Sequence, residues 1–289
     1  MATYFRPSSL SQALAIRARQ PVTVLAGGTD VYPARAARVG WGDMRRDDIL
    51  DIGAIGELKG IVEEPARFRF GALTTWDEMR RAPLPPAFAG YQKAARDIGG
   101  PQVQNRGTMA GNVCTASPAG DGIPCLLSLD ADVELRSERG RRIVPMAEFI
   151  DGYRHTLCRP DELVTAILIP KPPARAGGNF IKLGARRYLV ISIVMAAAVL
   201  ATDEVGTITH AHVAVGACSA VARRLPQLEE ALLGKPLAAA PDLVEANQLA
   251  LLRPIDDVRA SGAFRAAAAV DVVRDLLAGI GGEACGSAA

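Results

Sequence analysis

Residues Asn105–Asp121 read NRGTMAGNVCTASPAGD, a run that mixes glycines with short hydrogen-bonding side chains. The run has too many small and polar residues for a core strand or an amphipathic helix, so we expect a loop. Gly107 and Gly111 would let backbone N–H groups approach a polar ligand closely. The side chains of Thr108 and Asn112 can add hydrogen bonds. A long surface loop without a ligand is the alternative that composition leaves open.

A second glycine-rich run lies upstream, at Ala26-Gly27-Gly28-Thr29-Asp30. It follows the strand-like residues 22–25 and precedes a stretch, 31–39, that is typical of a helix. A helix that begins on such a loop offers free N–H donors and a positive end to an anion. Taken alone, the run fits an ordinary turn equally well. Together, the two runs predict a two-sided clamp on an extended anionic ligand.

Composition limits the function classes. The chain has 289 residues, 49% hydrophobic and 22% charged, and is long enough for two domains or three small lobes. Its net charge of +2 argues against a nucleic-acid-binding protein, which usually has a clear basic excess. The sequence contains no apolar run long enough to span a membrane and no secretory signal pattern. Five widely spaced cysteines, an odd number, predict reduced thiols and a cytoplasmic protein.

The periodicity predicts alternating strands and helices. Up to residue 55 we expect a helix at 12–18 with an N-cap before it, then strand 22–25, helix 31–39 and strand 49–52, which form a small α/β lobe. Further strands are expected at 68–72, 132–135, 142–144 and 162–170, and helices at 75–80, 91–98 and 123–129. The proline-rich residues 170–178 read as a linker.

Beyond this linker the sequence predicts strands at 179–183 and 208–216, and helices at 225–233, 241–252 and 263–277. The alanine-rich residues 191–202 are expected to form a buried helix or a strand–helix junction. The tail from Gly279 is expected to be mobile.

Other catalytic and metal-binding patterns are missing from the sequence. It has no G-x-G-x-x-G between a strand and a helix, no P-loop, no G-x-S-x-G and no C-x-x-C. His210 and His212 would share one face of a strand, but no third ligand lies nearby in sequence. We therefore assign no catalytic residue and no metal ligand. Cys114 is the one thiol inside the main glycine-rich run; it lies either near a cofactor or as a small filler in the loop.

Four patterns together resemble the FAD-binding subunit, or middle domain, of the molybdenum hydroxylase family. They are Tyr4-x-x-Pro7 with Ala13, AGGTD, the run 105–121, and Lys182-Leu-Gly-Ala-Arg-Arg187 followed by Ile191-Ser192. Their order and spacing agree from residue 4 to about 280. The sequence departs from the family pattern at Ala110, which replaces the first glycine of the usual Gly-Gly-Asn. Ile191 stands where carbon monoxide dehydrogenase-like members have an aromatic residue.

The resemblance implies an α+β fold with a two-lobed FAD-binding domain of the vanillyl-alcohol-oxidase (PCMH) type. This domain would cover residues 1–173, with lobes at about 1–55 and 56–173. A small C-terminal α/β domain, like that of carbon monoxide dehydrogenase flavoproteins, would cover 174–289. The resemblance gives it a three-stranded antiparallel sheet and helices.

The resemblance also implies roles for single residues. Ala26, Gly27, Gly28, Thr29 and Asp30 match one loop that holds the FAD pyrophosphate, and Thr108, Met109, Ala110, Gly111 and Asn112 match the other. Asp121 matches a carboxylate that contacts the cofactor. Leu163 lies in the strand that passes the flavin ring, and Lys182 matches a lysine at the flavin edge.

In function, the resemblance implies an electron-transfer subunit. A large partner subunit would carry molybdopterin and oxidise the substrate, and a small partner would carry two 2Fe-2S clusters that pass electrons to FAD on this chain. An external acceptor would then take the electrons, and the complex is expected to be a dimer of heterotrimers. A stand-alone FAD oxidoreductase and a flavin-free scaffold remain as alternatives.

Overall fold

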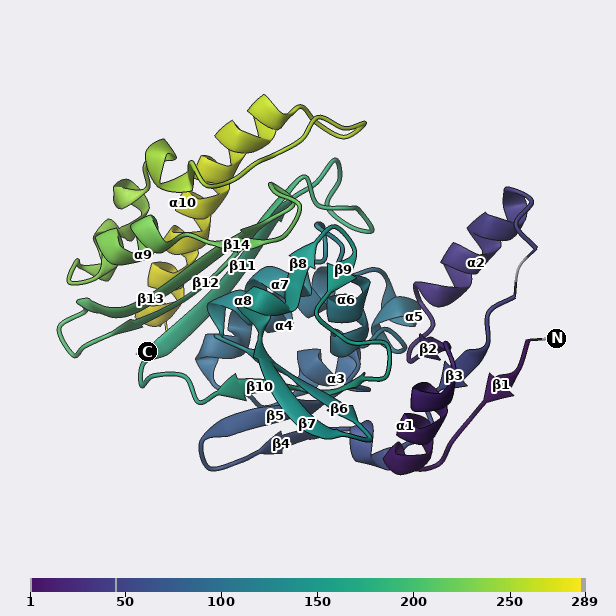
Figure 1. The fold of residues 1–289 in the computed structure, drawn as a ribbon. Helices are drawn as coiled ribbons and strands as arrows, with labels where there is room; N and C mark the ends of the chain where they lie inside the picture. Colours follow the sequence, from purple (N-terminus) through teal and green to yellow (C-terminus); the bar gives the residue numbers. More distant parts are fainter. Residues whose placement is uncertain (1, 45, 287–289) are drawn as a thin grey trace.

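The computed structural model describes residues 2–44 and 46–286. The N-terminal residues form a three-stranded parallel sheet in the order β1-β3-β2, with two helices (Figure 1). Its elements are β1 (Tyr4–Phe5), α1 (Leu10–Arg19), β2 (Thr23–Leu25), α2 (Val31–Gly40) and β3 (Ile49–Asp51). Helix α1 begins two residues before the predicted start at 12, because Ser9 is its N-cap and the Ser9 hydroxyl accepts a hydrogen bond from the Gln12 N–H. We call this the N-terminal sheet.

A five-stranded antiparallel sheet follows, in the order β4-β5-β10-β6-β7, and we call it the central sheet. Its strands are β4 (Ile61–Glu63), β5 (Arg67–Gly71), β6 (Asp132–Ser137), β7 (Gly140–Pro145) and β10 (Leu163–Pro170). Strand β10 lies in the middle of the sheet, and its residues 163–169 are all buried. The short segment η1 (Gly56–Leu58) leads from β3 into this sheet, and three short segments connect β7 to β10: α8 (Met146–Phe149), β8 (Ile150–Gly152) and β9 (His155–Thr156).

A layer of helices lies between the central sheet and the C-terminal part of the chain (Figure 1). It consists of α3 (Trp76–Arg81), η2 (Pro86–Phe88), α4 (Ala89–Asp97), α5 (Pro101–Gln104), α6 (Met109–Thr115) and α7 (Gly122–Ser128). Helix α3 starts with a capping box between Thr75 and Glu78. Together with strands of the central sheet and of the C-terminal sheet described next, these helices build the largest hydrophobic core, which contains Phe70, Phe88 and Tyr91.

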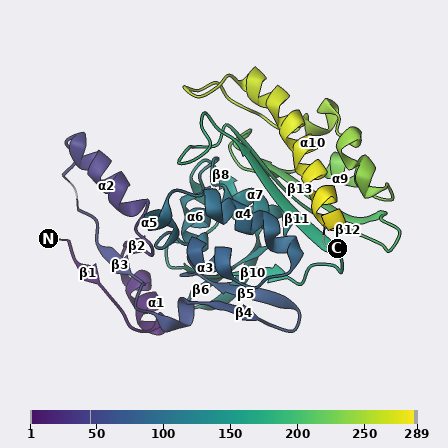
Figure 2. The same cartoon turned by 180° about the vertical axis from the view of Figure 1, so that it is seen from behind.

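The C-terminal sheet has four antiparallel strands in the order β11-β12-β13-β14, one more than the three predicted. They are β11 (Ala176–Leu183), β12 (Val194–Thr202), β13 (Ile208–Gly216) and β14 (Arg223–Arg224). The additional strand has only two residues, too few to give a sequence pattern. Helices α9 (Pro226–Leu232) and α10 (Gly262–Gly286) cover the outer face of this sheet, while α4 and α7 cover the inner face (Figure 2).

The alanine-rich run is a strand, so the prediction of a buried helix or a strand–helix junction at 191–202 is wrong. Alternate residues of β12 face two different cores. Met195, Ala197, Val199 and Ala201 pack towards α4 and α7, and Val194, Ala196, Ala198 and Leu200 pack towards α9 and α10. A strand that is buried on both faces has no polar alternation, so its sequence cannot be told from that of a buried helix.

Three smaller predictions also need correction. Residues 237–249 form two 3-10 segments, η3 (Leu237–Leu243) and η4 (Ala246–Leu249), instead of one helix, and Pro241 lies within the first. The connection between β10 and β11 spans only residues 171–175, because β11 begins at Ala176. Gly279 and Ile280 belong to α10, not to a mobile tail.

Among the described residues, no helix is long and apolar enough to cross a membrane.

Candidate functional site

The run 105–121 contains a helix, which contradicts the expectation of a loop throughout. Helix α6 begins after Thr108, whose hydroxyl accepts a hydrogen bond from the Gly111 N–H at 3.0 Å. Met109, Ala110 and Val113 point into the core and are buried. A side-chain N-cap and three buried apolar residues are sufficient for a short helix despite the glycine and threonine content.

The two glycine-rich runs lie directly against each other, as the clamp prediction requires. A Cβ atom at Gly27 would be 1.8 Å from the Arg106 carbonyl oxygen and 3.0 Å from the Gly107 Cα. Any side chain at residue 27 would therefore force the two segments apart. Gly28 has a φ of +77°, which favours glycine. At the other end of α6, the Thr115 hydroxyl donates to the Asp30 carboxylate at 3.0 Å.

A cleft of about 580 Å³ opens beside these runs. Its volume lies in the range of ligand sites. Ten of the thirteen predicted site residues line it. They are Ala26, Gly27, Gly28, Thr29, Asp30, Thr108, Ala110, Gly111, Asn112 and Leu163. Segments from the N-terminal sheet, the helical layer and the start of β10 thus meet at one site.

The other three predicted residues are placed differently. Met109 is fully buried in the core. Asp121 and Lys182 form an ion pair with 2.7 Å between Lys182 Nζ and Asp121 Oδ2, and their side chains are only 8% and 6% exposed. The Ser192 hydroxyl donates to the other Asp121 carboxylate oxygen at 2.6 Å. Burial raises the pKa of the Asp121 carboxyl, although Lys182 and Ser192 each act to lower it.

The ion pair adjoins the cleft through one backbone segment. Lys182 Nζ also donates to the Asp97 carbonyl oxygen at 3.1 Å, and the next residue, Ile98, lines the cleft. The pair therefore joins β11 of the C-terminal sheet to the helical layer at the side of the cleft formed by Ile98.

The residues present fit a dinucleotide cofactor such as FAD. Close-packed glycines leave backbone N–H groups accessible to a pyrophosphate. The buried Oδ1 atom of Asn112, a residue that lines the cleft, has no hydrogen-bond partner in the described structure. A Cβ atom at Gly122 would lie 3.0 Å from this oxygen, so it faces the start of α7 and not a ligand in the cleft, and the close-packed glycines alone carry the fit.

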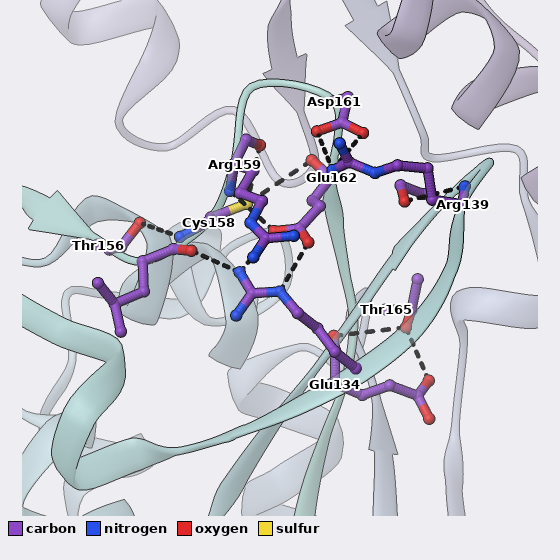
Figure 3. A network of polar contacts seen from close by, with 11 residues as sticks. Glu134, Arg139, Thr156, Cys158, Arg159, Asp161, Glu162 and Thr165 are labelled. Carbon is purple, nitrogen blue, oxygen red and sulfur yellow. Dashed lines mark hydrogen bonds and ion pairs between the residues drawn. The ribbon is translucent and has the colours of Figure 1, made fainter.

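The wall of the cleft that faces the N-terminal sheet is held by a network around Glu162 (Figure 3). The Arg142 guanidinium donates to both Glu162 carboxylate oxygens at 2.7 Å, and the Arg159 backbone N–H adds a third bond at 2.8 Å. Burial opposes the charge of Glu162, but the hydrogen bonds from Arg142 and Arg159 lower its pKa overall. The cleft-lining residues Thr156 and Cys158 lie on the segment that this network orders.

Sequence reasoning missed these wall residues, together with Arg17 and Ser192. Single arginine and glutamate residues at 17 and 162 have no local mark in the sequence, and Ser192 was noted only as part of a family pattern, without a role. The segments that contain them meet only in the folded chain.

Cys114 and Cys158 both line the cleft. The surface of Cys114 faces the cleft, but the surrounding protein desolvates its thiol, and this burial together with Cys158 raises its pKa to about 12. Burial raises the pKa of the Cys158 thiol to about 11. Both are therefore thiols, not thiolates, at neutral pH. The rings of His210 and His212 lie with centroids 4.0 Å apart and their planes tilted by 49°, so the two side chains share a face as predicted. Among the described residues, no three His, Cys, Asp or Glu side chains are grouped as metal ligands.

The chain matches two family models. Residues 1–172 match the FAD-binding domain in molybdopterin dehydrogenase. Residues 179–280 match the C-terminal domain of carbon monoxide dehydrogenase flavoproteins. The chain belongs to this family of molybdopterin dehydrogenase flavoproteins. Similar proteins include the FAD subunit of nicotinate dehydrogenase from Eubacterium barkeri, which is 33% identical over 81% of this chain and 80% of its own length.

A putative xanthine dehydrogenase FAD-binding subunit from Escherichia coli is 30% identical over 91% of this chain and 90% of its own length. A solved chain of carbon monoxide dehydrogenase from Hydrogenophaga pseudoflava superimposes with a TM-score of 0.87 and 28% identity, covering 97% of both chains. The chain is therefore an FAD-binding subunit of a heteromeric molybdenum-dependent oxidoreductase, and the comparisons favour this function over that of a stand-alone oxidoreductase.

Proposed function

We propose that the chain holds FAD in the cleft between the two glycine-rich runs and passes electrons from iron–sulfur clusters on a partner subunit to an external acceptor. The observation that supports this most directly is the contact of Gly27 with Arg106 and Gly107. It brings two segments about 80 residues apart in sequence into one surface of accessible backbone. FAD, when bound, supplies the redox chemistry through its isoalloxazine ring.

Each predicted residue has a role in this proposal. Residues 26–30 and 108–112 would hold the pyrophosphate. Asn112 would add side-chain N–H donors there, and Leu163 would form part of the apolar wall. Asp121 and Lys182 would lie at the edge of the flavin, where a cation stabilises negative charge on a reduced ring. Met109 would act only indirectly, by anchoring α6 in the core.

The finer organisation is also part of the proposal. We place the domain boundary between residues 173 and 174, with two lobes, 1–55 and 56–173, before it. This agrees with the two separate family matches and with the short connection 171–175. The partners would be a large molybdopterin-binding subunit and a small 2Fe-2S subunit. We propose a dimer of heterotrimers in the cytoplasm.

Purification of the full-length chain, alone and with its partner subunits, tests the function. We expect non-covalent FAD, identified by absorbance and by chromatography after denaturation. Substrate oxidation should occur only when the molybdenum and iron–sulfur subunits are present. Protein without flavin would favour the scaffold, and turnover by the chain alone would favour a stand-alone oxidoreductase.

Gly111→Val tests the placement of the clamp. A Cβ atom at Gly111 would lie 2.8 Å from Thr108 Oγ1, so a branched side chain there displaces the N-cap of α6 and crowds the cleft. We expect this variant to fold but to lose flavin. Gly40→Val is the matched control, because a Cβ atom at Gly40 meets nothing within 4 Å. Full flavin occupancy in Gly111→Val would show that the clamp is misplaced.

A further inference from the structure

Arg17 joins two separate parts of the molecule inside the cleft. It lies on α1, beside the N-terminal sheet, and it is one of the residues that line the cleft. Its Nη1 donates to the Val22 carbonyl oxygen at 2.7 Å, within the same part of the chain. Its Nε donates to the Glu162 carbonyl oxygen at 3.2 Å, 145 residues away, where strand β10 of the central sheet begins. The Arg17 guanidinium thus joins the part of the chain that contains the N-terminal sheet to the start of β10 in the central sheet.

The Glu162 carbonyl group, which accepts the hydrogen bond from Arg17 Nε, belongs to a well-ordered residue. The Glu162 side chain is fixed by Arg142 and by the Arg159 N–H (Figure 3). The Cys158 thiol donates to the same carbonyl oxygen at 3.6 Å. Residue 162 is 3% exposed. Because the acceptor cannot move freely, the hydrogen bond from Arg17 sets the separation of the two walls and does not merely follow a mobile loop.

The rest of the lining includes two hydrogen-bonded groups. In the first, the Trp76 N–H donates to the Gly107 carbonyl, and the Gly107 N–H donates to the Val103 carbonyl. Ile98 also lines the cleft and follows Asp97, whose carbonyl accepts from Lys182, so we assign it to this first side. The second group consists of Arg17, Val22 and Glu162, together with Cys158.

The next step rests on the proposed function, in which Lys182 lies at the flavin edge. The first group then faces the isoalloxazine ring, and residues 26–30 and 108–112 face the pyrophosphate. Since the pyrophosphate lies between the flavin and the adenosine in FAD, the second group faces the adenosine. We propose that Arg17 is a positioning residue that fixes the width of the cleft where it takes the AMP half of FAD.

Comparison of FAD with FMN tests this proposal, because FMN lacks the AMP half. The full-length chain is freed of flavin, and the affinity for each flavin is measured by fluorescence titration. Arg17→Met keeps the aliphatic stem but removes both hydrogen bonds. We expect its affinity for FAD to fall at least about tenfold, since each bond involves a charged donor, while its affinity for FMN stays within about twofold.

Two further variants complete the experiment. Arg17→Lys can reach only one of the two carbonyls at a time, so its affinity for FAD should lie between those of the wild type and Arg17→Met. Arg19→Met removes an exposed arginine from the same helix, and its affinity for both flavins should match the wild type.

Equal loss of FAD and FMN affinity in Arg17→Met would overturn the proposal, because it would indicate a general structural defect. Unchanged FAD affinity would also overturn it. Failure of the wild-type chain to bind FAD would instead contradict the proposed function itself, so the two failures are distinguishable.

Discussion

Replacement of Lys182 by methionine should destabilise the protein strongly, because it leaves the Asp121 carboxylate buried without its cation. The two side chains are 6% and 8% exposed, and their charged atoms lie 2.7 Å apart. Removal of one partner from a buried pair of this kind costs about 3–5 kcal/mol. Ser192 still donates to Asp121, so we expect a loss near the lower limit, about 3 kcal/mol, in the free energy of unfolding.

The assay is urea unfolding of the flavin-free chain, followed by far-UV circular dichroism. Lys171→Met is the control, because Lys171 pairs with Glu63 at 2.7 Å but the side chains are 42% and 61% exposed. Its loss should be no more than about 1 kcal/mol. The double variant Lys182→Met/Asp121→Asn removes both charges and should recover much of the loss, since a neutral amide is less costly to bury than an unpaired carboxylate.

The pH dependence of the free energy of unfolding tests the same ion pair independently. In Lys182→Met, burial still acts on Asp121 and only the hydrogen bond from Ser192 opposes it, so the folded pKa lies above the unfolded value of about 3.9. Such a group contributes its stability below the unfolded pKa and loses it as the pH rises through the folded pKa. The deficit relative to wild type should therefore shrink as the pH is lowered. A deficit equal to that of Lys171→Met, or one that is independent of pH, would refute this account of the pair.

Two other predictions concern the thiols and histidines. Cys114 lines the cleft, and its pKa is raised to about 12, so iodoacetamide at pH 8 should label it much more slowly than a free cysteine. Bound FAD should slow the labelling further, as measured by peptide mass spectrometry. Fast labelling that does not depend on FAD would contradict the placement of FAD in this cleft. His212 has its pKa lowered to about 4 by burial and by Arg224 and His210. It binds fewer protons when folded, so stability should fall as the pH drops from about 6.5 to 4. His212→Gln should flatten that part of the urea-midpoint profile, and an unchanged slope would show that other groups cause it.

The sequence predicted local features well where each has its own pattern. The strand 22–25, the AGGTD run and the helix after it were expected in that order, and the structure has β2, the loop and α2 there. Closely packed glycines leave a visible pattern, because they occur together in short runs of the sequence. The thirteen candidate residues came from the family resemblance, and ten of them line one cleft.

The features that the sequence could not predict depend on burial or on distant contacts. Strand β12 was mistaken for a helix because the helical layer covers one of its faces and α9 and α10 cover the other. Asp121 and Lys182 were each assigned to the cofactor, but their mutual ion pair and the hydrogen bond from Ser192 depend on segments 61 and 71 residues away. The bridge from Arg17 to Glu162 is of the same kind.

Ala110 shows which glycines of the clamp are needed and why. This residue replaces a glycine of the family pattern, yet it lies in the first turn of α6 and is 3% exposed. A helical backbone accepts alanine, and the methyl group adds to the core beside Met109 and Val113, so the replacement costs nothing in backbone conformation. Gly27 differs, because a Cβ atom there would meet backbone at 1.8 Å. Close approach between the two runs therefore requires glycine at residue 27, whereas the helical turn at residue 110 does not.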